Sequence, residues 1–218
     1  MKPQAPISTY SPFEESINIY SHAIGIVLSL VALVLLMIRS GQQAGALPLI
    51  SATIFGLSLV TLYTTSTLYH NCKQPALRAR LRIFDHVSIY ILIAGTYTPF
   101  ALIVLTGMTG WVIFAISWGL ALVGSCLKIF FTGKYQLLST IMYVLMGWLI
   151  VFAIKPLTDN LAEGGLLWLL IGGILYSTGG ILYSIKRMPL NHATFHLLVM
   201  CGSFCHFISL YYFVLPTF

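Results

Sequence analysis

Two histidines four residues apart, His192 and His196, are the first sign of chemistry in this 218-residue chain. On a helix this spacing puts both imidazoles on one face, about 6 Å apart, where they can bind one metal ion. A third imidazole, that of His70, would complete a three-histidine site. Three protein ligands and an open position are the pattern of catalytic rather than structural zinc. The alternative is that the pair only hydrogen-bonds a loop carbonyl or caps a helix.

Asp85 and Ser66 are the candidate catalytic residues next to this site. A metal lowers the pKa of a bound water toward about 7, and Asp85 could hold that water or remove its proton. Ser66 precedes His70 by one helical turn and shares its helix face, so its hydroxyl could hydrogen-bond the water or polarise a substrate carbonyl. Each residue also has a plainer role: Asp85 could cap the helix that follows it, and Ser66 could bond back to the carbonyl of Leu62.

Three further histidines compete for a role at the site. His22 follows Asn18 by four residues, and we expect both to support the ligands by hydrogen bonding rather than to bind the metal. His86 points about 100° away from the preceding aspartate on a helix, so the two side chains should not face one ion. His206 lies 14 residues beyond His192, about 21 Å further along a helix. It cannot reach the same ion, and packing or hydrogen bonding is its expected role.

The elements that position these residues must lie in a membrane. The chain is 58% hydrophobic and 7% charged, whereas about 25% of the residues of a soluble domain are charged. A soluble two-domain enzyme is excluded, and the acidic residues are only Glu14, Glu15, Asp85, Asp159 and Glu163. Of these, we expect only Asp85 to lie beside the three histidines. The net charge of +6 comes from basic residues scattered among apolar runs, which indicates membrane topology rather than binding to nucleic acid.

Seven apolar segments are long enough to cross a bilayer as helices, which takes about 20 residues for 30 Å of hydrocarbon. Their apolar runs are unbroken, unlike the alternating strands of a barrel, so the predicted class is all-α. The segments are 17–38, 47–69, 86–105, 111–131, 138–154, 165–185 and 192–215. The short connections predict one seven-helix transmembrane domain over residues 1–218, with 1–16 as a short cytoplasmic N-terminal segment. No cleavable signal is expected, because Met1–Phe13 is polar and rich in proline.

The distribution of lysine and arginine predicts the orientation, because loops that face the cytoplasm carry more of them. Nine lie on the side of the N-terminus and two on the other side: Lys2, Lys73, Arg78, Arg80, Arg82, Lys128, Lys134, Lys186 and Arg187 against Arg39 and Lys155. The N-terminus is therefore expected in the cytoplasm and, after seven crossings, the C-terminus outside. This places His70, Asp85, His192 and His196 at one depth near the cytoplasmic face, although none of them entered the count.

The motif GGILYS occurs twice in the sixth segment, at Gly172–Ser177 and Gly179–Ser184, one heptad apart. Glycines at this spacing allow a neighbouring helix to approach closely, so helix packing is the favoured interpretation and a groove that admits lipid is the alternative. Pro99 predicts a kink in the third segment, and Pro48 predicts the start of the second helix.

Several of these stretches together resemble the bacterial haemolysin III family: Glu14-Glu15 with Asn18 and His22, STLYH at Ser66–His70, FDH and IAGTYTPF within Phe84–Phe100, NHATFH at Asn191–His196 and CHF at Cys205–Phe207. That family is similar to the progestin and adiponectin receptor proteins and belongs with alkaline ceramidases in a superfamily of proposed membrane hydrolases. The resemblance covers nearly the whole chain. It implies a seven-helix bundle in the bacterial cytoplasmic (inner) membrane, with Zn²⁺ held at the cytoplasmic end by His70, His192 and His196. Asp85 would bind water there, and Ser66 matches the family's serine.

The hypothesis that follows is a zinc-dependent intramembrane hydrolase with a membrane lipid or fatty acyl substrate, cleaved at an amide or ester, and a link to lipid homeostasis. Asp85 would serve as general base and later as proton donor, and Ser66 would stabilise the oxyanion. One alternative keeps the zinc as a structural part of a lipid sensor. Another, suggested by the family name, is a haemolysin-like pore. A pore needs polar lining across the full bilayer, whereas the ionisable residues here gather on one side.

Overall fold

The computed structural model describes residues 10–105, 107–132, 135–185 and 187–215, and in this part of the chain every regular element is a helix. Seven helices are long and apolar enough to span a membrane, so the predicted all-α, seven-span class is confirmed. In chain order the elements are α1 (Pro12–Ser40), α2 (Leu47–Asn71), α3 (Pro75–Pro99), η1 (Phe100–Leu105), α4 (Gly107–Phe131), α5 (Gln136–Gly147), η2 (Leu149–Ala153), α6 (Ile154–Asn160), α7 (Glu163–Ser184), α8 (Asn191–Ser209) and η3 (Leu210–Val214). Three of the basic residues used to predict the orientation lie outside the described residues: Lys2, Lys134 and Lys186.

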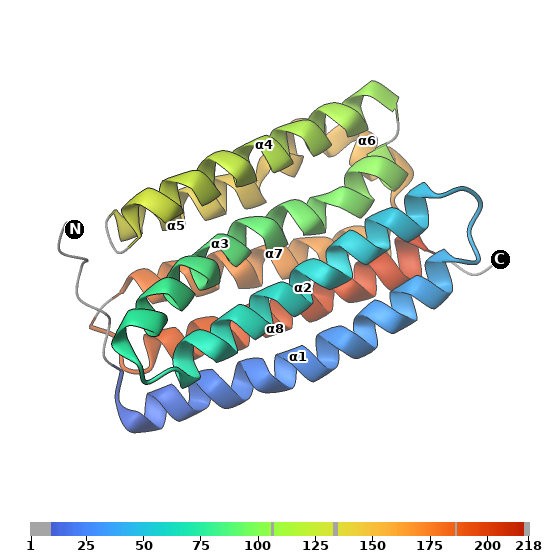
Figure 1. Ribbon diagram of the computed structural model, residues 1–218. Coiled ribbons are helices and arrows are strands. Elements are labelled where there is room, and N and C mark those ends of the chain that lie inside the picture. Colours follow the sequence, from blue (N-terminus) through green and yellow to red (C-terminus); the bar gives the residue numbers. More distant parts are fainter. Residues whose placement is uncertain (1–9, 106, 133–134, 186, 216–218) are drawn as a thin grey trace.

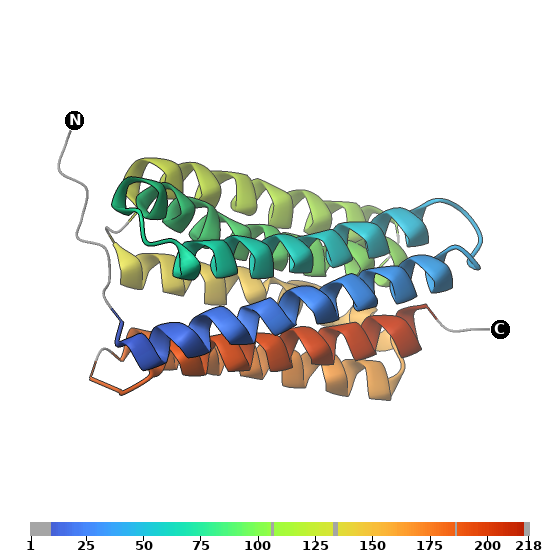
Figure 2. The same cartoon turned by 60° about the horizontal axis from the view of Figure 1, so that its bottom comes forward.

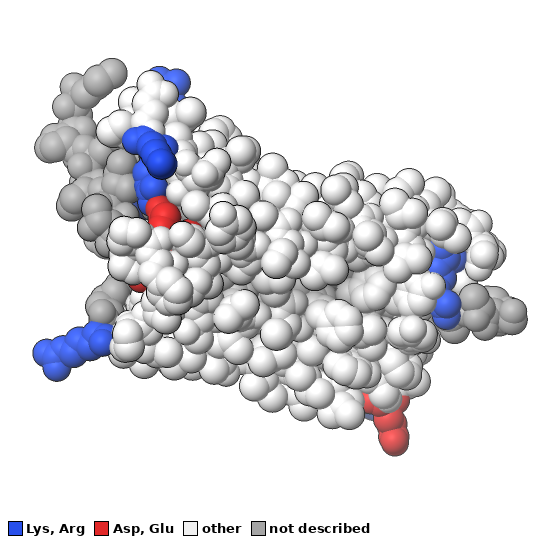
Figure 3. Space-filling model, turned by 90° about the horizontal axis from the view of Figure 1, so that it is seen from below, with Lys and Arg blue, Asp and Glu red and all other residues white. Residues whose placement is uncertain are grey.

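The helices run side by side along one direction (Figure 1 and Figure 2). α1 packs against α2 and α8, α7 packs against α8, α3 lies on α2, and α4 lies on α3 at the far edge. α1 begins at one end of the bundle and η3 ends at the other, as seven crossings require. Figure 3 shows charged side chains at the two ends and an uncharged surface between them. Large apolar side chains such as Leu122 and Leu145 are exposed on the helices, as lipid contact requires.

Two helices begin five or more residues earlier than the hydropathy pattern predicts. α3 begins at Pro75 rather than at residue 86, so Asp85 lies about three turns into the helix and the interpretation of Asp85 as a helix cap is wrong. α1 begins at Pro12 rather than at residue 17, which shortens the predicted N-terminal segment 1–16 and puts Glu15 in the first turn of the helix. The reason is the same in both helices. These first turns carry polar side chains, which a hydropathy scale assigns to loops even where the side chains face the protein interior.

The predicted kink at Pro99 takes the form of a change in helix type. Pro99 is the last residue of α3, and the π-helical η1 continues the same span from Phe100 to Leu105. Proline has no N–H to donate, and its ring displaces the carbonyl four residues earlier, which favours a wider turn. Pro48 lies in the first two positions of α2, so the predicted helix start is confirmed.

The first glycine of each GGILYS repeat packs α7 against α8. A Cβ atom built on Gly172 would lie 2.0 Å from Cδ2 of His206 and 3.1 Å from the carbonyl oxygen of Gly202. A Cβ atom built on Gly179 would lie 3.3 Å from the Cβ atom of Leu198. A larger residue at Gly172 would overlap atoms of α8, and one at Gly179 would require Leu198 to move by a few tenths of an ångström, so the packing interpretation is confirmed for both glycines.

We expect Gly172→Ala to destabilise the protein by about 1–3 kcal/mol, because the added methyl group must push α8 away. Gly173→Ala is the matched control, since the nearest atom to its added Cβ is Cζ2 of Trp148, at an ordinary contact distance of 3.9 Å. Thermal unfolding of both variants in detergent measures the difference. If the two variants proved equally stable, the close contact between α7 and α8 would not matter for the fold.

Candidate metal centre

Three histidine side chains meet at the end of the bundle where α2 ends and α8 begins. His70 lies in the last turn of α2, and His192 and His196 lie one turn apart at the start of α8. The Nε2 atom of His192 is 3.0 Å from the Nε2 atoms of both other histidines, and the ligand atoms of all three lie within 4.8 Å of one another. All three residues are buried. The group could hold a metal ion.

The geometry and the chemistry of this group both suit zinc. Two ligand nitrogens that are each about 2.0–2.1 Å from a tetrahedral zinc ion lie about 3.3 Å apart, close to the separations seen here. Neutral imidazoles are common zinc ligands, and three of them leave one position open. His70, His192 and His196 are the residues that would hold the ion.

Glu15, which the hydropathy pattern places ahead of the first span, lies against His70. Its Oε2 atom is 2.9 Å from Nδ1 of His70, and its Oε1 atom forms an ion pair with Arg78. An ionised carboxylate can only accept a hydrogen bond, so Nδ1 of His70 carries a proton. A neutral His70 ring then turns its Nε2 lone pair toward the other two histidines, the arrangement usual for a metal ligand. The expectation that Asp85 is the only carboxylate beside the three histidines is therefore wrong.

Asp85 and Ser66 are neighbours beside the histidines. Both are buried, Asp85 on α3 and Ser66 one turn before His70 on α2. The carboxyl group of Asp85 lies within electrostatic range of His70 and Arg82, and the Ser66 hydroxyl lies next to it without a hydrogen bond of normal geometry. Since the Ser66 oxygen has no hydrogen-bond partner among the described residues, the alternative of a bond back to Leu62 is wrong.

His22 and Asn18 also lie beside the ligands, on α1. The ring of His22 stacks on the ring of His196, with centroids 3.6 Å apart and planes inclined by 6°. Asn18 is fully buried, and within the described part of the chain neither its amide nor the His22 ring nitrogens have a hydrogen-bond partner. The contact between His22 and His196 is thus ring stacking rather than the expected hydrogen bond.

The other two histidines lie away from the cluster. Nδ1 of His86 is 2.7 Å from the carbonyl oxygen of Arg82, one turn earlier on α3. His206 packs against Gly172 of α7, and its ring centroid is 5.1 Å from that of Tyr176. Neither ring belongs to the three-histidine group.

Tyr10 and Glu15 are among the residues that contact the site without having been predicted to belong to it. Tyr10 stacks on His192, with ring centroids 4.7 Å apart, and no motif in the sequence indicates this contact. Glu15 does have a sequence signal. It precedes Asn18 by three residues and His22 by seven, a spacing that puts all three on one helix face. This spacing indicates a shared helix face only if α1 begins before Glu15, and in the structure α1 begins at Pro12.

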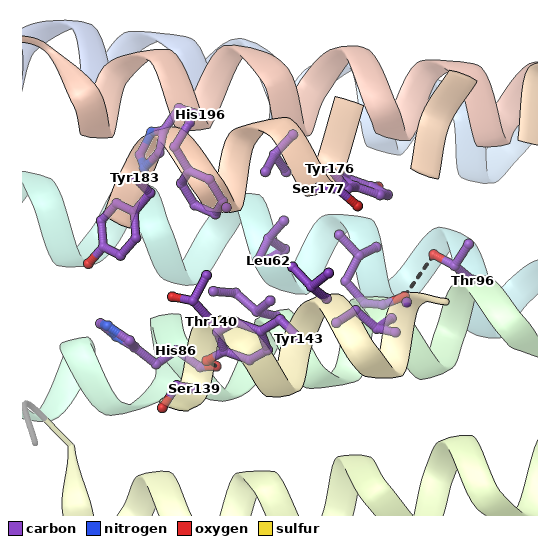
Figure 4. Close-up of a pocket in the computed structure, with 18 of the residues that line it drawn as sticks. Leu62, His86, Thr96, Ser139, Thr140, Tyr143, Tyr176, Ser177, Tyr183 and His196 are labelled. Carbon is purple, nitrogen blue, oxygen red and sulfur yellow. Dashed lines mark hydrogen bonds between the residues drawn. The ribbon is translucent and has the colours of Figure 1, made fainter. Parts of the chain in front are cut away.

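A mainly apolar cavity runs from the histidines into the bundle and has a volume of about 130 Å³ (Figure 4). His192 lines one end and His206 lines the other, so the cavity extends about 21 Å along α8. α7 contributes one face of both GGILYS repeats to the wall: Gly173, Tyr176, Ser177, Gly180 and Tyr183. The second glycine of each repeat therefore leaves room in the cavity, while the first glycine packs on α8.

We expect Glu15→Gln to weaken zinc binding about 10–100-fold, the usual effect of removing the partner of a ligating histidine. A glutamine has no charge to pair with Arg78, and it can turn its NH₂ group toward Nδ1 of His70. Competition with a chelator measures the affinity of the purified protein. Glu163→Gln, at the exposed start of α7, is the control. Equal zinc affinity in the two variants would refute the role assigned to Glu15.

Comparison with known proteins agrees with these features. The sequence model of the family described as "Haemolysin-III related" matches residues 10–207. The chain is 46% identical to Hemolysin-3 of Bacillus cereus, over 94% of this chain and 93% of that protein. It is 46% identical to a Hemolysin-3 homolog of Bacillus subtilis (strain 168), over 87% of this chain and 89% of that protein. It is also 29% identical to the monocyte to macrophage differentiation factor of Homo sapiens, over 97% of this chain and 90% of that protein. No solved structure is significantly similar to it. This membrane protein therefore belongs to the haemolysin III family.

Proposed function

We propose that the protein is a zinc-dependent intramembrane hydrolase that cleaves a lipid amide or ester. One observation carries the proposal: the Nε2 atoms of three buried histidines lie together, and two of these histidines, His192 and His196, line a mainly apolar cavity with Asp85. A lipid whose chain occupied this cavity would have its polar linkage at the histidines. The charge count assigns that end of the bundle to the cytoplasm, where water is available for hydrolysis.

Zn²⁺, when bound, supplies a Lewis acid that polarises a carbonyl group and makes water more acidic. In the proposed reaction, Asp85 takes a proton from the attacking water as the water oxygen bonds to the carbonyl carbon. Ser66 donates its O–H to the oxygen that gains negative charge. When the bond from that carbon to the leaving nitrogen or oxygen breaks, Asp85 gives the proton to the leaving atom. Each turnover consumes one water and leaves the carboxylate as it began.

A zinc-stabilised lipid sensor without turnover is the second candidate. It is favoured by contacts that join three helices at one point, through Glu15 on α1, His70 on α2 and His192 on α8. A metal at this point would stabilise the bundle whether or not a lipid is cleaved. A pore ranks last, because the cavity is mainly apolar and the charged side chains seen in Figure 3 lie at the two ends of the molecule.

We expect Asp85→Asn to fold and to bind zinc like the wild type while hydrolysing lipid about 10²–10⁴-fold more slowly, the usual contribution of a general base. Zinc content, thermal stability and release of fatty acid are measured on the purified protein. Asp159→Asn, on the exposed α6, is the control and should keep full activity. If Asp85→Asn hydrolysed lipid at the wild-type rate, this mechanism would be excluded. The sensor hypothesis predicts that Asp85→Asn leaves the phenotype unchanged.

His196→Ala tests the metal itself, because it removes one of three ligands from a buried site. We expect loss of bound zinc and of hydrolysis together. Under the sensor hypothesis the main effect of losing a ligand is structural, so His70→Ala should lower the unfolding temperature strongly. A wild-type protein that is fully folded, metal-free and not stabilised by added zinc would contradict both hypotheses. Reproducible single-channel conductance in reconstituted bilayers would favour the pore instead.

A further inference from the structure

Basic side chains form a second polar region at the head of the cavity, next to the histidines. Arg82 and His86 lie one turn apart on α3, and Lys128 lies in the last turn of α4. His86 and Lys128 line the cavity, and Arg82 is close enough to both to interact with them electrostatically. None of the three side chains belongs to the metal-binding group.

Lys128 is the unusual member of this basic region. A lysine near the end of a membrane helix normally extends its ammonium group to the aqueous interface. Lys128 is instead only 3% exposed, and it lines the cavity. Among the described residues no carboxylate oxygen lies within 4.0 Å of its Nζ atom. The charged residue that acts on it most is Arg82, which carries the same sign of charge.

The carboxylates nearby already have partners. Glu15 is paired with Arg78 and a histidine ligand. Asp85 lies within electrostatic range of Arg82. Asp85 also lies 3.7 Å from Nδ1 of His86. Among the described residues the ammonium group of Lys128 has no carboxylate within 4.0 Å, so it is a positive charge without a paired anion in a buried place. A buried charge is costly unless an opposite charge pairs with it.

We propose that Lys128, with the positive charge of Arg82 beside it, binds the anionic group of a membrane lipid whose chain lies in the cavity. The group is an oxyanion, either the phosphate of a lipid headgroup or the carboxylate of a fatty acid. Figure 4 shows Ser139 and Thr140 of α5 on the same side of the cavity as His86, where their hydroxyls add polar groups to this region. The inference rests on the proposed function in one respect only. If the protein is the proposed hydrolase, then an anionic lipid is the substrate class of that hydrolase.

The chemistry of these side chains selects against neutral lipids. An ammonium group donates charge-assisted hydrogen bonds to phosphate or carboxylate oxygens, and the neighbouring Arg82 guanidinium adds positive charge. A neutral lipid in the same place would leave the Lys128 charge buried without a partner, which disfavours its binding. The basic region thus provides both an attraction for anionic lipids and a penalty for neutral ones.

Quenching of Trp148 fluorescence by lipids with brominated chains tests the proposal, because Trp148 lines the same cavity. The full chain is purified in a neutral detergent, and the signal of Trp148→Phe is subtracted as background. We expect brominated phosphatidylglycerol or brominated fatty acid to quench at lower concentration than brominated diacylglycerol. The two anionic lipids show whether phosphate or carboxylate is preferred, with inorganic phosphate as a competitor for a headgroup site. Equal affinity for diacylglycerol and the anionic lipids overturns the proposal.

Variants of Lys128 locate the effect. We expect Lys128→Met to weaken binding of the preferred anionic lipid about tenfold or more, the loss of one charge-assisted hydrogen bond, while Lys128→Arg retains binding. Lys155→Met is the matched control, since Lys155 has 83% of its side chain exposed on α6. Lys128→Met should be at least as thermally stable as the wild type in lipid-free detergent, because it removes a buried charge. The proposal is overturned if Lys128→Met binds the anionic lipid with unchanged affinity. It is also overturned if Lys128→Met is less stable than the wild type and binds neutral and anionic lipids equally weakly.

His196→Ala separates this proposal from the hydrolase. The basic region should still select anionic lipids in this variant, even though zinc binding and turnover are lost. If no turnover is found in the wild type but binding depends on Lys128, the hydrolase fails and the lipid site stands. If His196→Ala loses the preference for anionic lipids and Lys128→Met keeps it, the metal site holds the anion and the proposal is overturned.

Discussion

The hydrogen bond between His70 and Glu15 gives a buried imidazole a partner at the point where the helices converge. The bond fixes the His70 ring, and the fixed ring directs Nε2 toward α8. The ion pair of Glu15 with Arg78 adds the first turn of α3 to the same junction. One carboxylate in the first turn of α1 thus connects α1, α2 and α3 and orients the His70 ring toward α8.

Two carboxylates near the histidines have different surroundings, and the difference separates their roles. Glu15 has both oxygens engaged, one by His70 and one by Arg78, so it is committed to orientation. Asp85 lines the cavity beside Ser66, where a substrate or water could reach it. In the proposed mechanism, the carboxylate that orients a metal-binding histidine is therefore not the one that moves a proton.

The seven spans and the three-histidine group could be predicted from the sequence because both depend on local patterns. Apolar runs measure the preference of a segment for lipid, and the spacing of His192 and His196 fixes their common helix face. The early starts of α1 and α3 could not be predicted in this way. The residues that the pattern left out of the helices include Glu15 of α1 and Arg82 and Asp85 of α3, which are partly or fully buried within the bundle, and a hydropathy scale does not distinguish an interior-facing polar residue from one in a loop. Glu15 was missed for the same reason, and the cavity depends on contacts among α3, α5, α7 and α8 that no single segment encodes.

The paired glycines of α7 divide two tasks between adjacent residues. Gly172 and Gly179 set how closely α8 approaches, whereas Gly173 and Gly180 set how much of the cavity stays open. A larger residue at the second position of a pair would narrow or shorten the cavity and leave the interface between α7 and α8 as it is. If the cavity holds a lipid chain as proposed, relatives of this protein could therefore diverge in the length of chain they accept through these two positions alone, without a change of fold.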